Sequence, residues 1–117
     1  MGLITAEGIR VFAYHGHLPE EAILGGHFIV SVWVNVDTEE VEKTDELKHT
    51  VDYVRIIELV KEQMAIRSDM IEHSAKRIVD AILPLHKVKK VKVELEKIQP
   101  AIDASFDKIS VITQGNN

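Results

Sequence analysis

An alternating apolar segment breaks at residues 12–21 into side chains that can carry chemistry. These residues include a glycine, a proline, Tyr14, His15, His17, Glu20 and Glu21. Such a cluster at the end of a strand predicts either a sharp turn or part of a site. Considered singly, Glu20 and Glu21 are expected at the surface, as loop or first-turn carboxylates.

Lys97 is a second candidate because its position conflicts with the alternation around it. The polar residues of the segment 91–97 are mostly even-numbered, whereas Lys97 continues the odd-numbered apolar series. In one interpretation the strand ends one or two residues earlier and the lysine turns to solvent. In the other, its ammonium lies at the mouth of a pocket, where desolvation would favour a neutral amine able to take part in proton transfer.

Glu72 and Tyr53 also permit two interpretations each. Glu72 lies three residues after Asp69, and a capping interaction explains that spacing. Alternatively, a carboxylate at the positive end of a helix can accept two parallel N–H bonds from a planar, amidine-like edge of a ligand. Tyr53 has helical spacing to Ile56 and Val60, which predicts packing in the core, where its hydroxyl would need a partner.

No metal, disulfide or nucleotide motif accompanies these residues in the sequence. The chain has no Cys, and its six His include no pair at i,i+4 spacing. Gly25 and Gly26 stand alone, without the glycine pattern of a phosphate loop or a dinucleotide fold. We therefore predict no metal site, no disulfide and no bound cofactor.

The composition is typical of a single soluble domain covering residues 1–117. The net charge of −5 disfavours nucleic acid and anionic membranes as partners. No segment approaches the ~18 apolar residues of a membrane helix, and the first residues lack the pattern of a signal peptide. These observations predict a cytoplasmic protein.

Periodicity divides the chain into two strands, two helices and two further strands. The predicted elements are strands at 2–13 and 27–37, an acidic connection at 38–50, helices at 51–64 and from about 69 to 82, strands at 91–97 and 106–113, and a tail at 115–117. Thr50 is the predicted cap of the first helix, and the second helix begins near Ser68 or Asp69. The order β-β-α-α-β-β predicts an α+β fold with a four-stranded antiparallel sheet and two helices on one face.

Five groups of residues, in this order, resemble the dihydroneopterin aldolase family. They are Tyr14-His15-Gly16 with Leu18-Pro19-Glu20-Glu21 and Gly25; Thr44-Asp45; Thr50-Val51-Asp52-Tyr53; Ile71-Glu72-His73 with Ala75, Arg77 and Ile78; and Lys97, Pro100 and Ile102. Each group alone is weak evidence. Together they extend the resemblance over residues 4–113, nearly the whole chain.

The resemblance implies a tunnelling fold. In this fold, β-β-α-α-β-β subunits associate side by side into a ring, and their sheets form a continuous barrel. Family members are commonly octamers of two stacked tetrameric rings, with sites between neighbouring subunits. A homo-oligomeric ring would also pair the two edges that a lone four-stranded sheet exposes.

The resemblance also implies the reaction, a retro-aldol cleavage in folate biosynthesis. The family splits a small pterin, 7,8-dihydroneopterin, into 6-hydroxymethyl-7,8-dihydropterin and glycolaldehyde. Cleavage leaves carbanion character beside the ring, and the ring C=N bond can absorb it as an enamine. The substrate is then its own electron sink, and the reaction requires neither a Schiff base nor a metal.

The catalytic roles of the family fall on three residues of this chain. Lys97 would be the main acid–base group, acting on the side-chain hydroxyl with an ordered water. Glu21 would bind the side-chain hydroxyls of the substrate or that water. Tyr53 would contribute from the neighbouring subunit, by ring packing or by proton delivery.

The binding roles fall on four further residues. Glu72 would anchor the pterin through its 2-amino group and ring N–H. Main-chain groups near Val51, Asp52 and Ile71 would hold the remaining edge of the ring.

Two features depart from the family pattern. The loop Ala101-Ile102-Asp103-Ala104 lacks the glycine that family members often carry after the lysine, and Gly26 replaces a usual polar amide. The loop over the substrate, and one contact or turn near Gly26, are therefore expected to differ.

Two other functions stay open at the level of sequence. An epimerase acting on dihydroneopterin or its triphosphate would use the same cleavage in reverse, although the chain offers no convincing set of basic residues for a triphosphate. A non-catalytic pterin-binding assembly module would need Glu72 but not an acid–base pair. The presence of both Lys97 and Glu21 favours the aldolase.

Overall fold

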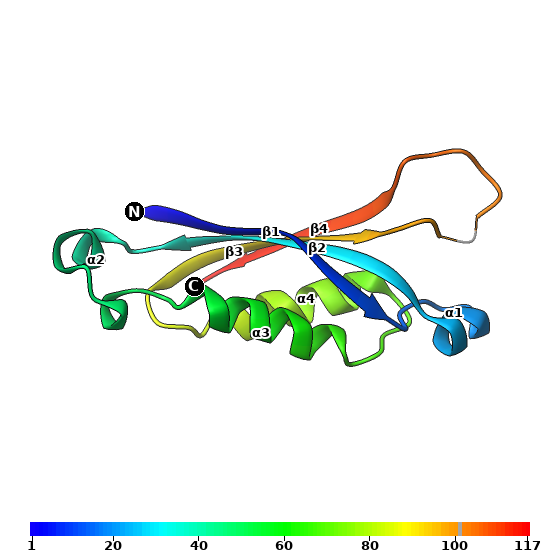
Figure 1. The fold of residues 1–117 in the computed structure, drawn as a ribbon, viewed down its shortest axis with the longest axis horizontal. Helices are drawn as coiled ribbons and strands as arrows, with labels where there is room; N and C mark the ends of the chain where they lie inside the picture. The colour runs from blue at the N-terminus through cyan, green and yellow to red at the C-terminus, as the bar shows by residue number, and fades with distance from the viewer. Residues whose placement is uncertain (101) are drawn as a thin grey trace.

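Residues 1–100 and 102–117 are described in a computed structural model of the chain. The elements are β1 (Gly2–Ala13), α1 (Pro19–Leu24), β2 (Gly26–Val36), α2 (Glu39–Thr44), the 3₁₀ helix η1 (Leu47–His49), α3 (Tyr53–Met64), α4 (Ile71–Ile82), β3 (Val88–Lys97) and β4 (Ile109–Asn116). The strands form one antiparallel sheet in the order β1-β2-β3-β4. α3 and α4 cover one face of this sheet (Figure 1). The predicted sheet with helices on one face is confirmed.

The core lies between that sheet face and the two helices. Every even-numbered residue of β2 from Phe28 to Val36 is at most 1% exposed. Four of these five are valines, whose branched Cβ favours extended backbone, and the period of two puts all five on one face. The antiparallel register pairs Leu95 of β3 with Val30 and Lys97 with Phe28. Lys97 therefore lies on the core face, at the last residue of the strand.

The helix starts differ from the sequence prediction. α3 is capped by Asp52, whose carboxylate accepts the N–H of Val54 at 2.9 Å, and not by Thr50. α4 begins at Ile71, with Met70 as its N-cap, and not at Ser68 or Asp69. The physical reason at Ser68 is that its N–H and carbonyl are both bonded to residues 15 and 16, so they are not free to start a helix.

The predicted connection at 38–50 is partly helical, and the predicted bounds of the last strand are wrong. The connection 38–50 contains α2 and η1 between its polar turns. The last strand runs from Ile109 to Asn116 instead of 106–113, because Gly115 and Asn116 pair with β3 rather than forming a tail. Among the described helices, none has the length and apolarity needed to cross a membrane.

Candidate active site

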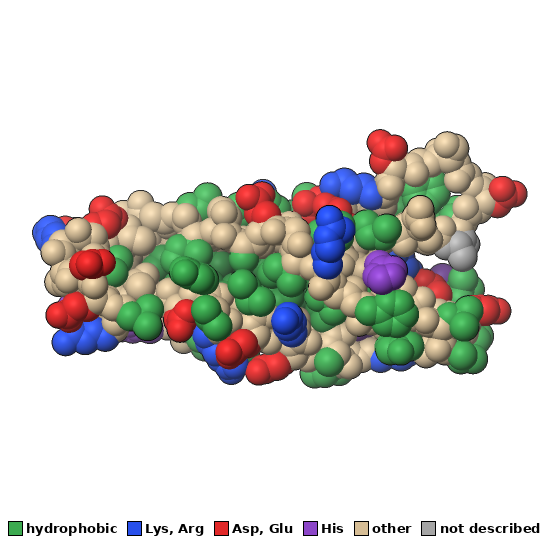
Figure 2. All heavy atoms as spheres, viewed as in Figure 1, with side chains coloured by type: hydrophobic (Ala, Val, Ile, Leu, Met, Phe, Trp, Pro, Cys, Tyr) green, Lys and Arg blue, Asp and Glu red, His purple; other side chains and the backbone are tan. Residues whose placement is uncertain are grey.

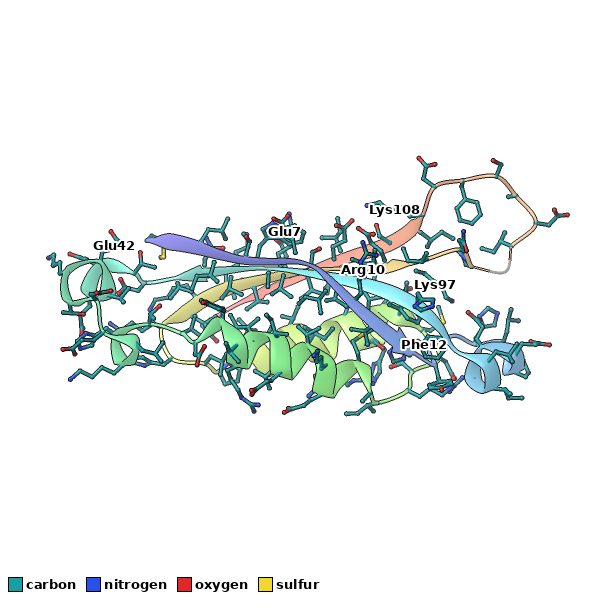
Figure 3. All side chains as sticks on the ribbon, in the orientation of Figure 1. Glu7, Arg10, Phe12, Glu42, Lys97 and Lys108 are labelled. Carbon is teal, nitrogen blue, oxygen red and sulfur yellow. The ribbon has the colours of Figure 1, made fainter. Side chains whose placement is uncertain are left out.

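An ion pair between Lys97 and Glu21 marks the α1 end of the molecule. Nζ of Lys97 contacts Oε2 of Glu21, and the two side chains are 20% and 18% exposed. Figure 3 labels Lys97 at this end, where β3 stops and α1 lies close by. The alternative in which the strand ends early and Lys97 turns to solvent is therefore wrong. The expectation that Glu21 is a simple surface carboxylate is wrong as well, whereas Glu20 is exposed.

Glu21 is oriented by the short helix that carries it. It occupies the first turn of α1, and its Oε1 accepts the backbone N–H of Leu18 at 3.3 Å. Burial by itself would raise the pKa of Glu21. The hydrogen bonds from Lys97 and Leu18, together with the Lys97 charge, outweigh burial and hold the pKa of this carboxyl below its usual value. The Glu21 side chain is therefore a carboxylate near neutral pH.

A pocket of about 300 Å³ joins this ion pair to the start of α4. Its polar lining includes Glu21, Lys97 and Glu72, with Ile71 beside them. Apolar side chains of β4 and the preceding loop complete the wall: Ile102, Ile109 and Val111. Figure 2 shows this end of the molecule on the right, where the surface is hollowed between the α1 region and the loop after β3. Mostly apolar walls with a few convergent polar groups are typical of a small-molecule site.

A second cavity, of about 160 Å³, shares the same ion pair. Besides Glu21 and Lys97 it is lined by His15, His27 and Gln99, with Gly26 at its wall. A Cβ added at Gly26 would meet no atom within 4 Å. The cavity is therefore open beside Gly26, which has no side chain to fill it. This is the position where the sequence predicted a contact or turn different from that of the family.

Glu72 does not serve as a helix cap. The N-cap of α4 is Met70, which forms no side-chain capping bond, and Asp69 is paired with Arg67 at 2.7 Å. The capping interpretation of Glu72 is therefore wrong. Its exposed carboxylate lies in the first turn of α4, where the partial positive charge of the helix end favours an anion.

Comparisons with known proteins show the family of this chain. The family model of FolB, dihydroneopterin aldolase, matches residues 4–114. A dihydroneopterin aldolase of Staphylococcus epidermidis is 32% identical over 111 residues, which cover 93% of this chain and 92% of the relative. This chain belongs to the dihydroneopterin aldolase family. Family members are aldehyde-lyases of folate biosynthesis, and the predicted enzyme class is confirmed.

Solved structures of dihydroneopterin aldolases share the fold. The E. coli enzyme in complex with neopterin has a TM-score of 0.89 at 20% identity, covering 99% of this chain and 100% of that chain. The enzyme from Burkholderia thailendensis, bound to guanine, has a TM-score of 0.79 at 18% identity, covering 99% and 91%. At these identities the similarity concerns the fold alone.

Three residues given roles by the resemblance to dihydroneopterin aldolases lie away from the pocket. Val51, Asp52 and Tyr53 stand at the start of α3, on the side of the molecule that carries α2, whereas α4 starts on the α1 side (Figure 1). Tyr53 is 62% exposed, so its predicted packing in the core is wrong within one chain. The first buried residue of α3 is Ile56.

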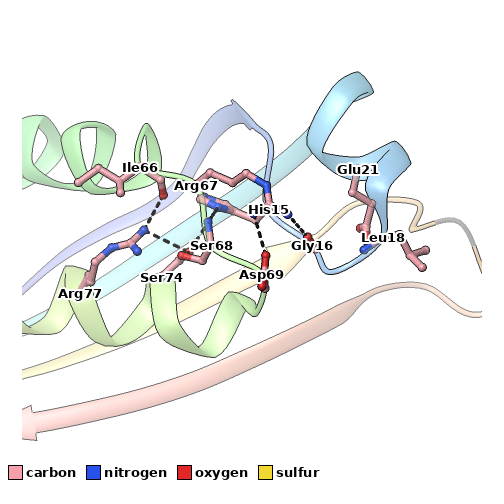
Figure 4. Close-up of polar contacts among 10 residues, drawn as sticks. All are labelled: His15, Gly16, Leu18, Glu21, Ile66, Arg67, Ser68, Asp69, Ser74 and Arg77. Atoms are coloured by element: carbon pink, nitrogen blue, oxygen red, sulfur yellow. Dashed lines mark hydrogen bonds and ion pairs between the residues drawn. The ribbon is translucent and has the colours of Figure 1, made fainter.

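Sequence reasoning missed a buried polar cluster beside the second cavity, which His15 lines (Figure 4). His15 is 1% exposed, and its Nδ1 accepts the backbone N–H of Ser68 at 3.0 Å. Ser68 Oγ lies 2.8 Å from Ser74 Oγ. Burial lowers the pKa of His15, and the charge of Arg77 lowers it further, so the ring is neutral. The only signal in the sequence was the position of His15 beside a glycine at the end of a strand.

Among the described residues, no three His, Asp or Glu side chains lie close enough together to hold a metal ion. Of the loop predicted to depart from the family pattern, Ile102, Asp103 and Ala104 are described, and Ile102 is 53% exposed at the pocket rim. Ala101 lies outside the described residues.

Proposed function

We propose that Lys97 and Glu21 are the acid–base pair of this dihydroneopterin aldolase and that Glu72 anchors the pterin ring. The observation that carries the proposal is their convergence. An ammonium and a carboxylate in contact share one pocket with a second carboxylate that is not engaged in helix capping. In this assignment Glu72 binds the ring, whereas Lys97 and Glu21 transfer protons.

Recognition of the ring follows from the chemistry of the Glu72 carboxylate. A pterin presents a 2-amino group next to a ring N–H, and two carboxylate oxygens can accept both hydrogen bonds in parallel. Guanine, the ligand named for the Burkholderia thailendensis enzyme, carries the same pair of donors. The backbone of Ile71, in the same pocket, would hold part of the remaining ring edge.

The chemical step needs a proton removed and a proton returned. A base takes the proton of the hydroxyl on the second side-chain carbon, the bond between the first and second carbons breaks, and glycolaldehyde leaves. The electron pair of that bond moves into the ring C=N bond, and protonation of the first carbon gives 6-hydroxymethyl-7,8-dihydropterin. Lys97 would mediate these transfers through an ordered water, and Glu21 would hold the hydroxyls or that water. General acid–base steps of this kind contribute about 10²–10⁴-fold in rate.

We further propose that Val51, Asp52 and Tyr53 reach the pocket from a neighbouring subunit of a ring. Two features support this assembly. β1 and β4 are the outer strands of the sheet, with unpaired edges that another copy could extend. Tyr53 and Val54 are 62% and 51% exposed at the start of α3, as expected for side chains that a partner covers.

Incubation of the purified protein with 7,8-dihydroneopterin tests the assignment. Release of glycolaldehyde with 6-hydroxymethyl-7,8-dihydropterin is expected. Formation of an epimer without glycolaldehyde would identify an epimerase, and pterin binding without turnover would identify a binding module. Native mass spectrometry of the same preparation distinguishes a tetrameric ring from an octamer, and a monomer would contradict the shared site.

A further inference from the structure

We infer that His15, Ser68 and Ser74, here called the His15 cluster, position Glu21 for proton transfer. The inference rests on the proposed function, because it assigns to Glu21 a part in turnover. None of the three residues needs to touch the substrate. They act by fixing the segment before α1 against the segment before α4. Glu21 belongs to α1, and Glu72 belongs to α4.

Three hydrogen bonds join these two segments (Figure 4). Ser68 N–H donates to His15 Nδ1 at 3.0 Å, and Gly16 N–H donates to the Ser68 carbonyl at 3.0 Å. The guanidinium of Arg67 donates to the Gly16 carbonyl at 2.6 Å. Both peptide groups that flank the Cα of Gly16 are therefore held by residues 67 and 68.

His15 is fixed from several sides. Its ring meets Phe28 edge to face, with centroids 5.3 Å apart, and Phe28 is paired with Lys97 across β2 and β3. Ser74 of α4 is fully buried, and its Oγ lies 3.5 Å from Nδ1 of His15. Since Nδ1 accepts a main-chain N–H, the neutral ring carries its proton on Nε2. A buried, hydrogen-bonded ring of this kind has little freedom to shift.

The backbone of Gly16 connects these hydrogen bonds to the position of Glu21. A Cβ built on Gly16 would collide with the carboxylate of Glu21, so that carboxylate lies directly against the Gly16 backbone. If residues 67 and 68 lost their hold on residues 15 and 16, the backbone under the carboxylate would move. A displacement of about 1 Å at a reacting group can cost about 10²-fold in rate. Glu72 belongs to α4 itself, so ring binding should survive such a shift.

The test compares His15→Leu with His15→Asn, whose side-chain oxygen restores an acceptor near the position of Nδ1. His86→Leu is the matched control, because His86 is exposed and lies after α4, outside both cavities. Turnover is measured as glycolaldehyde release, and pterin affinity by fluorescence titration with 6-hydroxymethylpterin. For His15→Leu, at a temperature where circular dichroism shows it folded, we expect kcat to fall about 10–100-fold while Kd changes less than about threefold. His15→Asn should recover most of kcat, and His86→Leu should match the unaltered chain.

Each other outcome is decisive. Unchanged kcat in folded His15→Leu would overturn the positioning role, as would a loss of turnover and binding that only follows the unfolded fraction. If His15→Leu does not fold, Ser74→Ala takes its place, with an expected fall in kcat of about 3–10-fold at constant Kd. Absence of glycolaldehyde release by the unaltered chain would instead overturn the proposed function itself.

Discussion

Nζ of Lys97, the last residue of β3, is in direct contact with the carboxylate of Glu21, which lies in the first turn of α1. Each side chain keeps about a fifth of its surface exposed, enough for a water or a substrate hydroxyl to reach the pair. A partly exposed charged pair at a pocket mouth is a candidate for proton transfer, and this is the role that we propose for it.

Replacing Lys97 by alanine should therefore abolish turnover while leaving the pterin bound. We expect glycolaldehyde release to fall by about 10²–10⁴-fold, with the pterin Kd changed only slightly. Lys76→Ala is the control, since Lys76 is an exposed lysine of α4 paired with Asp80. Equal losses of binding and turnover would contradict the acid–base role of Lys97.

Replacing Glu72 by alanine should chiefly weaken binding. Loss of a charge-assisted contact to the ring is expected to cost about 1.5–3 kcal/mol of pterin binding free energy, measured by titration. The helix should persist, because Glu72 takes no part in capping α4. Asp80→Ala, on the exposed side of the same helix, should leave affinity unchanged. Wild-type affinity in Glu72→Ala would remove Glu72 from the site.

Gly16→Ala should impair both folding and turnover. Gly16 has φ +140°, and a methyl group there would collide with the Glu21 carboxylate. We expect the free energy of unfolding to fall by about 1–3 kcal/mol, measured by urea denaturation, together with a lower kcat. Gly26→Ala is the control for stability alone, because its Cβ would meet open space. Equal stability of the two variants would contradict the close contact at Gly16.

Mixed oligomers should recover activity if sites lie between subunits. Chains carrying Lys97→Ala and chains carrying Tyr53→Ala, each impaired alone, would combine into rings in which about a quarter of the sites are intact. Mixing Lys97→Ala with Glu72→Ala chains is the matched control. Both of those residues line one pocket of the same chain, so no intact site can form. If neither mixture recovers activity, Tyr53 is not part of a site shared between subunits.

The ion pair should also appear in the acid stability of the protein. The pKa of Glu21 is lowered in the folded chain from 4.5, so the unfolded chain binds more protons as the pH falls below that value. The stabilisation is complete above about pH 4.5 and is lost as the pH falls through the folded pKa. The stability difference between the unaltered chain and Glu21→Gln, measured by denaturation at fixed protein concentration, should therefore shrink below pH 4.5. A difference that stays constant with pH would contradict the pairing.

Much of the fold could be predicted because it depends on local periodicity. The alternating valines of β2 fixed which face is buried, and the odd-numbered position of Lys97 placed it on the same face of β3. The errors fall where distant contacts decide. Gly115 and Asn116 have the composition of a tail but pair with β3, and Ser68 is kept out of α4 by its bonds to residues 15 and 16.

The sequence by itself determined the order of elements, the buried face of the sheet, and the candidates Glu21, Tyr53, Glu72 and Lys97, because residue type and period are local properties. Only the tertiary structure decided that Glu21, Glu72 and Lys97 line one pocket, while Tyr53 is exposed at the start of α3, on the α2 side. It also decided that His15 is buried and links the turn after β1 to the segment before α4. Those relationships depend on how segments far apart in the chain pack together, and no local pattern specifies that packing.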